Sequence, residues 1–178
     1  MVFVAILALP LPHKFSIGLV LFSIASFTDF LDGYYARKYQ LVTTFGKLMD
    51  PLADKILMCS AFVVLCEEHL VAAWVVVIIL AREFLVTGIR LVATSQGLVL
   101  AADKLGKLKT IFQISTIVYF LLYLASAEPT FAFLAPLLRL KLLSPEILGM
   151  ILIGLSLATT LVSGINYLMG NKQLLEDC

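Results

Sequence analysis

The stretch DFLDGYYARKYQLVTTFGKLMDPLAD (residues 29–54) places four aspartates between two long apolar segments. Charged side chains are costly in the hydrocarbon of a membrane, so carboxylates at such a place need water or bound cations. The stretch also contains Arg37, Lys38 and Lys47, which form a basic connection. We therefore interpret it as the end of one apolar helix, a short connection, and the beginning of the next helix.

The composition of the whole chain indicates a membrane protein. It has 178 residues, of which 61% are hydrophobic and 14% charged. Its mean hydropathy is +1.03. Soluble domains are roughly half apolar and about a quarter charged. We predict an all-α, multi-pass integral membrane protein with a single domain over residues 1–178, and we expect no nucleic-acid partner. The cysteines at 59, 66 and 178 are expected to be free thiols, because two of them lie in apolar runs.

Apolar runs separated by polar or proline-containing turns predict a bundle of six transmembrane helices. Residues 1–12 would span only about 18 Å, short of the ~30 Å hydrocarbon layer, so we expect an incomplete first helix. Asp50-Pro51 suits a helix opening, because proline is tolerated in the first turn and an aspartate there can accept from free amides. The other five helices are expected at about 15–36, 51–66, 70–92, 111–125 and 145–169.

Lysine and arginine counts predict the orientation of the bundle. If the first helix starts inside, seven basic residues lie on the inner side: Arg37, Lys38, Lys47, Arg90, Lys104, Lys107 and Lys109. The outer side has three, namely Lys14, Arg139 and Lys141. The aspartates are therefore expected to face the cytoplasm.

The four aspartates are spaced for one shared site. Asp29 and Asp32 are three residues apart, and Asp50 and Asp54 are four apart. On helices, both spacings put the two carboxylates of a pair on one face. A set of oxygen ligands without histidine or cysteine suits hard divalent ions, so we expect Mg²⁺ or Mn²⁺, and two ions would balance the four charges. Such a pair of ions supports phosphoryl displacement.

Small residues and an arginine accompany the carboxylates. Gly33, Ala36 and Gly46 would let a ligand or a neighbouring backbone approach closely, and the Arg37 guanidinium could bind a phosphate through two parallel hydrogen bonds. Two alternatives stay open on these residues alone. The aspartates could be helix caps or solvated interfacial charges, or they could line a cation-transport pathway.

The pattern D-x2-D-G-x2-A-R-x8-G-x3-D-x3-D resembles the signature of the CDP-alcohol phosphotransferase family. Every spacing is met, at Asp29, Asp32, Gly33, Ala36, Arg37, Gly46, Asp50 and Asp54. The stretches LVTTFGKLMDPLADK, AREFLVTGIR and LGKLKT are similar to the bacterial phosphatidylglycerophosphate synthase branch of that family. Members of this branch usually have an N-x-x-T-x-x-R-like stretch ahead of the first helix, which contributes to nucleotide binding, and the chain has no such stretch.

The resemblance implies an enzyme of phospholipid biosynthesis in the bacterial plasma membrane, surrounded by lipid. Such an enzyme transfers a phosphatidyl group from CDP-diacylglycerol to sn-glycerol 3-phosphate and releases CMP. It further implies that Asp29, Asp32 and Asp50 bind metal, and that Asp54 is the general base and also lies by the second ion. CDP-diacylglycerol would lie against Asp29, Asp32, Gly33, Ala36, Arg37 and Gly46. A homodimer is implied as well.

The acceptor's own phosphate needs cations away from the metals. The candidates are Arg82, Arg90, Lys107 and Lys109, because the family binds that phosphate in a cationic pocket and arginine within a membrane is costly unless functional. The alternative for Arg82 is an ion pair with Glu83, and for Arg90 and Lys107 it is contact with lipid headgroups. A sibling enzyme with serine, inositol phosphate or phosphatidylglycerol as acceptor would share the aspartates but need not share these cations.

Overall fold

The computed structural model describes residues 2–9, 11–39, 44–95, 104–138 and 140–170. Within its helices, only the course of the backbone is described for residues 29–30, 32–39, 44–54, 94–95 and 104. The described elements are all helical, which confirms the predicted all-α class. They are α1 (Val2–Ala8), α2 (Lys14–Tyr39), α3 (Thr44–Glu67), α4 (Ala73–Ser95), α5 (Lys104–Ala125), η1 (Pro129–Leu134), α6 (Ala135–Leu138), η2 (Lys141–Leu143), η3 (Pro145–Gly149) and α7 (Met150–Gly170).

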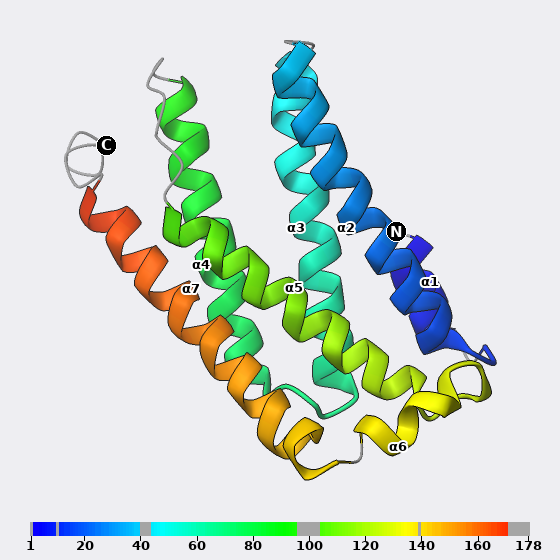
Figure 1. Ribbon diagram of the computed structural model, residues 1–178. Helices are drawn as coiled ribbons and strands as arrows, with labels where there is room; N and C mark the ends of the chain where they lie inside the picture. Colours follow the sequence, from blue (N-terminus) through cyan, green and yellow to red (C-terminus); the bar gives the residue numbers. More distant parts are fainter. Residues whose placement is uncertain (1, 10, 40–43, 96–103, 139, 171–178) are drawn as a thin grey trace.

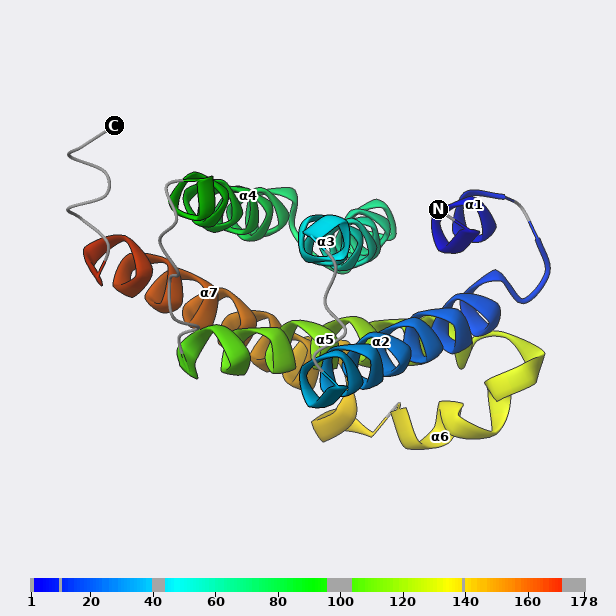
Figure 2. The same cartoon turned by 90° about the horizontal axis from the view of Figure 1, so that it is seen from above.

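Six of the helices form two layers. Viewed from above, α1, α3 and α4 lie in one layer, and α2, α5 and α7 lie in the other (Figure 2). Helix α5 crosses the bundle obliquely and contacts α2, α3 and α7. The end of α2, the beginning of α3 and the end of α4 all lie at the top of Figure 1. The aspartate-bearing stretch therefore belongs to one end of the bundle, and the turns from α1 to α2 and from α3 to α4 belong to the other.

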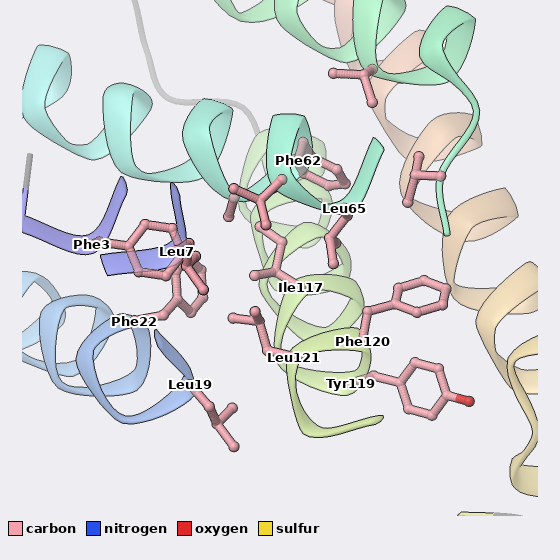
Figure 3. Packing of buried hydrophobic residues seen from close by; sticks show 14 of the residues in the cluster. Phe3, Leu7, Leu19, Phe22, Phe62, Leu65, Ile117, Tyr119, Phe120 and Leu121 are labelled. Carbon is pink, nitrogen blue, oxygen red and sulfur yellow. The ribbon is translucent and has the colours of Figure 1, made fainter. Parts of the chain in front are cut away.

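Aromatic and branched side chains from α1 to α6 fill the core, part of which is shown in Figure 3. Phe22 of α2, Phe62 of α3 and Phe120 of α5 are almost completely buried, and Phe3 of α1 packs on Phe22 with a centroid distance of 5.8 Å. A β-carbon at Gly18 would lie 2.8 Å from Leu7 Cδ2. Glycine at this position of α2 thus lets α1 pack closely against it.

The end of the bundle opposite the aspartates is held together by polar contacts. The Glu128 carboxylate, just after α5, accepts hydrogen bonds from the Phe15 and Ser16 amides, each at 2.9 Å. These amides belong to the first turn of α2, where backbone donors have no partner inside the helix. Lys14 forms an ion pair at 3.4 Å with Glu68, which lies in the α3–α4 turn. The start of α2 is therefore fixed to both neighbouring connections.

Two predicted helix boundaries were wrong. Helix α3 begins at Thr44, so Asp50-Pro51 lies inside it. Proline removes one donor and crowds the carbonyl four residues earlier, but it does not prevent the preceding residues from being helical. Helix α5 begins at Lys104, so Lys107 and Lys109 lie in its first two turns and not ahead of it. Because lysine has a high helix propensity, the helix extends into the lysine-containing residues before the apolar run. The apolar run alone therefore predicted too short a helix.

Two helical segments in the described part of the chain are long and apolar enough to cross a membrane: Leu105–Ala125 and Lys141–Gly170. Helices α2, α3 and α4 have 26, 24 and 23 residues. At about 1.5 Å per residue each exceeds the ~30 Å hydrocarbon layer, but they contain charged residues. The predicted count of six spans therefore stays a prediction, as does the orientation.

Candidate functional site

The backbone places the four aspartate positions on two adjoining helices. Asp29 and Asp32 lie in the last part of α2, and Asp50 and Asp54 lie in the first part of α3. Both pairs are now on observed helices, so each pair occupies one helix face, as the spacing predicted. Asp50 lies in the second turn of α3. It therefore cannot be the cap of that helix, which removes one alternative considered for it.

The other motif positions lie on the same two helices. Gly33, Ala36 and Arg37 follow Asp32 along α2, and Gly46 lies one turn before Asp50 in α3. The side chains of residues 29–30 and 32–54 lie outside the described set, so the contacts of the motif residues stay predictions. Among the side chains that are described, no group of three or more His, Cys, Asp or Glu residues is placed to hold a metal ion.

A buried charge cluster joins α4 and α5. Glu83 of α4 and Lys109 of α5 are both buried, and the Lys109 ammonium donates to Glu83 Oε1. Arg82 Nη1 approaches the same oxygen atom at 3.4 Å. The ion pair that the sequence suggested for Arg82 is thus present, and the same carboxylate also binds a second cation. Arg82 and Lys109, two of the four predicted acceptor residues, are brought together by it.

Helix α7 completes the surroundings of Arg82. Arg82 Nη2 donates to Ser163 Oγ at 2.8 Å. A β-carbon at the next residue, Gly164, would lie 3.1 Å from Arg82 Cγ, so glycine leaves room for the arginine stem. The buried Nε of Arg82 has no hydrogen-bond partner among the described residues. The guanidinium is therefore held by two helices and retains one buried donor.

Helix α3 brings the charge cluster towards the aspartates. Lys55 is the residue after Asp54, and its charge acts on both Glu83 and Lys109. Cys59, one turn further along α3, also lies within reach of the charges of Glu83 and Lys109. The cluster thus lies beside the turn of α3 that follows Asp54.

The two remaining predicted acceptor residues lie apart from this cluster. The Arg90 guanidinium is positioned over the Tyr167 ring of α7, 5.9 Å from its centroid, which is within cation–π range. It is eight residues beyond Arg82, so it lies about 12 Å further along α4. Lys107 is exposed. It is two residues before Lys109, a spacing at which helical side chains do not share a face.

Sequence reasoning did not identify Glu83 and Ser163 as parts of this site. Glu83 was considered only as the neighbour of Arg82, and its link to Lys109 spans 26 residues. Ser163 lies in an apolar helix, where a serine usually indicates a small residue at a packing interface. The one available signal was the presence of a carboxylate and two cations in segments of high hydropathy.

Comparison with known proteins identifies the family of the chain. The family model for CDP-alcohol phosphatidyltransferase matches residues 1–162. The chain belongs to the CDP-alcohol phosphatidyltransferase family. The match includes the aspartate motif of α2 and α3 as well as Arg82, Glu83 and Lys109, whereas Ser163 lies one residue beyond it.

Two relatives within the CDP-alcohol phosphatidyltransferase family bear the same name. A protein of Bacillus subtilis is 51% identical over 116 residues, which cover 65% of this chain and 59% of the relative. One of Rickettsia typhi is 36% identical over 156 residues, covering 88% of this chain and 80% of the relative. Both are called CDP-diacylglycerol–glycerol-3-phosphate 3-phosphatidyltransferase. The chain thus matches less than two thirds of the length of the Bacillus relative.

Proposed function

We propose that this protein transfers a phosphatidyl group from CDP-diacylglycerol to sn-glycerol 3-phosphate, which gives phosphatidylglycerol phosphate and CMP. The observation that carries the proposal is the complete eight-position motif on the adjoining ends of α2 and α3. The name shared by the relatives from Bacillus and Rickettsia supports the choice of substrates. The cations Arg82 and Lys109, which lie beside α3, favour an acceptor that is itself an anion.

The aspartates form a donor set that fits divalent metal ions. Asp29, Asp32, Asp50 and Asp54 provide only carboxylate oxygens, which Mg²⁺ and Mn²⁺ prefer, and they come in two helical pairs. Metal ions bound there would polarise the diphosphate of CDP-diacylglycerol and offset the charge of the departing CMP. Gly33, Ala36 and Gly46 leave room for the nucleotide, and Arg37 offers it two parallel N–H donors.

Asp54 is proposed as the general base. The acceptor hydroxyl attacks the phosphorus that bears the diacylglycerol, and its proton passes to the Asp54 carboxylate. The bond from that phosphorus to the bridging oxygen of the diphosphate breaks, and CMP leaves with that oxygen. A carboxylate near the nucleophile lowers the barrier because it removes the proton as the new bond forms.

Arg82 and Lys109 are proposed to bind the phosphate of the acceptor. Together with Glu83 they carry two positive charges and one negative charge, so the buried group keeps a net charge of +1. Burying an unbalanced charge is unfavourable unless another group compensates it. A phosphate would do so and could also accept from the buried Arg82 Nε. Arg90 and Lys107, on the same two helices, are proposed to guide the acceptor towards this pair.

The proposed setting is one membrane domain with six spans. Its aspartate end would face the cytoplasm, where the water-soluble acceptor is available, while the lipid donor enters from the bilayer. The excess of lysine and arginine that the sequence assigns to that side of the membrane supports this orientation, although these residues lie in the helix ends and not in the connections. The homodimer implied by the resemblance is retained as part of the proposal.

One assay tests the proposed reaction. Purified protein is given CDP-diacylglycerol and Mg²⁺, and CMP release is followed while the acceptor is varied among glycerol 3-phosphate, serine, inositol phosphate and phosphatidylglycerol. We expect release with glycerol 3-phosphate alone. Release with another acceptor would identify a sibling enzyme, and no release with any acceptor would favour a cation pathway lined by the aspartates.

A further inference from the structure

Glu83 is the point at which two cations from different helices meet. Its Oε1 accepts from the Lys109 ammonium of α5 and lies 3.4 Å from Arg82 Nη1 of α4. All three side chains are largely removed from water: the exposed fractions are 13% for Arg82, 10% for Glu83 and 6% for Lys109. A single carboxylate oxygen thus determines how closely the two cations approach.

Without this carboxylate the two cations would separate. Like charges repel more strongly in a buried site than in water, because the surroundings screen them less. Both side chains are long and have many rotamers, so nothing intrinsic to them would keep the pair together. The Ser163 hydroxyl holds only Arg82, through Nη2 at 2.8 Å. The position of Lys109 relative to Arg82 therefore depends on Glu83.

Arg82 and Lys109 can bind a further anion in addition to Glu83. One negative charge faces two positive ones, and Arg82 Nε is buried without a partner among the described residues. A phosphate can accept several hydrogen bonds from such donors at once. The carboxylate thus assembles the cations but leaves donors for another anion.

We propose that Glu83 is a positioning residue for the acceptor: it holds Arg82 and Lys109 together as a preformed site for the phosphate of the attacking substrate. This inference rests on the proposed function, which assigns the acceptor phosphate to these two cations. Preorganised donors bind better because no binding energy is used to bring them together.

The test separates binding of the two substrates. In Glu83→Gln the side chain keeps its shape but loses its charge, so KM for glycerol 3-phosphate is expected to rise by about tenfold or more. KM for CDP-diacylglycerol is expected to stay within about twofold. Glu83→Asp, which keeps the charge on a shorter stem, should recover part of the loss. Glu146→Gln is the matched control, because Glu146 is exposed in η3, and it should change neither KM.

A purely structural ion pair predicts a different result. The yield of folded Glu83→Gln protein would fall, but the remaining enzyme would show both KM values unchanged, and this would overturn the inference. A lowered KM for glycerol 3-phosphate would overturn it as well, since Glu83 would then compete with the phosphate.

Lys109→Gln distinguishes this inference from the proposed function. If Lys109→Gln raises KM for glycerol 3-phosphate and Glu83→Gln does not, positioning by Glu83 is wrong while the acceptor site stands. If Lys109→Gln has no effect on that KM, the acceptor site itself is wrong. Should Glu83→Gln fail to fold, the double variant with Lys109→Gln removes both charges. We expect it to match Lys109→Gln alone, whereas independent roles would multiply the two effects.

Discussion

Glu83 of α4 and Lys109 of α5 form a buried ion pair between two helices that are separated in the sequence by residues 96–103. Arg82 extends the contact to Ser163 of α7. Three helices are thereby fixed relative to one another beside the part of α3 that follows Asp54. The cations thus lie beside α3, one of the two helices that carry the aspartates, where the proposed function requires a site for an anionic acceptor.

Replacement of the proposed base should stop turnover without unfolding the protein. Asp54→Asn removes the proton acceptor at nearly constant size, and general-base catalysis contributes about 10²-fold or more. We expect CMP release to fall by at least that factor, with an unchanged thermal unfolding profile. Glu146→Gln again serves as the control for loss of an exposed carboxylate. If Asp54→Asn kept more than about a tenth of the activity, another residue would be the base.

Activity should depend on a divalent metal ion. Four carboxylates in two helical pairs repel one another unless cations are bound. Treatment with EDTA should therefore abolish CMP release, and Mg²⁺ or Mn²⁺ should restore it, as followed by a coupled CMP assay. Full activity after exhaustive chelation, verified by metal analysis of the protein, would contradict the assignment of Asp29, Asp32 and Asp50 to metal binding.

The sequence predicted much of this fold, because long apolar runs dominate it. The predicted helix at 15–36 corresponds to α2, and the predicted helix at 145–169 corresponds to η3 and α7. The early start of α5 was missed because its first residues are lysine-rich and read as a polar connection. The start of α3 was missed because Pro51 was placed in a first turn.

The charge cluster could not be predicted in the same way. Arg82 and Glu83 are neighbours in the sequence, so an ion pair between them could be predicted. The link from Glu83 to Lys109 and that from Arg82 to Ser163 depend on how α4, α5 and α7 pack. Only the packed structure identifies which of several buried polar residues meet. The short elements η1, α6 and η2 were likewise missed, because their apolar residues have no helical period long enough to recognise.

Loss of the Glu128 carboxylate should destabilise the fold at the end opposite the aspartates. It accepts from the Phe15 and Ser16 amides at 2.9 Å, and these donors have no partner within α2. Glu128→Ala should lower the free energy of unfolding by about 1–2 kcal/mol, as for other lost helix caps. Thermal unfolding in detergent measures this. Glu67→Ala, at the exposed last residue of α3, should have little effect, and equal effects of the two changes would contradict the cap.

Two glycines near one another in the chain should respond in opposite ways to alanine. A β-carbon at Gly149 would lie 2.7 Å from Phe120 Cζ, whereas one at Gly154 has no atom within 4 Å. Gly149→Ala should lower the free energy of unfolding by about 1–3 kcal/mol through overpacking. Gly154→Ala should raise it by up to about 1 kcal/mol, because alanine favours the helix. If the unfolding midpoints of the two variants both rose or both fell, this packing would be contradicted.

His69 should be replaceable by glycine with a gain in stability. It adopts φ 58° after the end of α3, a left-handed conformation that favours glycine. Its amide donates to the Cys66 carbonyl at 3.0 Å, and the Leu70 amide donates to the Leu65 carbonyl at 3.0 Å, which is the Schellman pattern of a helix end. His69→Gly should raise the free energy of unfolding by about 1 kcal/mol. A loss of stability would mean that the imidazole itself contributes to the turn.

The most direct measurement of the central proposal is the identity of both products. Purified protein is incubated with CDP-diacylglycerol, glycerol 3-phosphate and Mg²⁺, and the lipid and water-soluble products are analysed by mass spectrometry. Attack at the phosphorus that bears the diacylglycerol predicts phosphatidylglycerol phosphate and CMP in equal amounts. Phosphatidic acid together with CDP-glycerol would show attack at the other phosphorus and would contradict the proposed reaction.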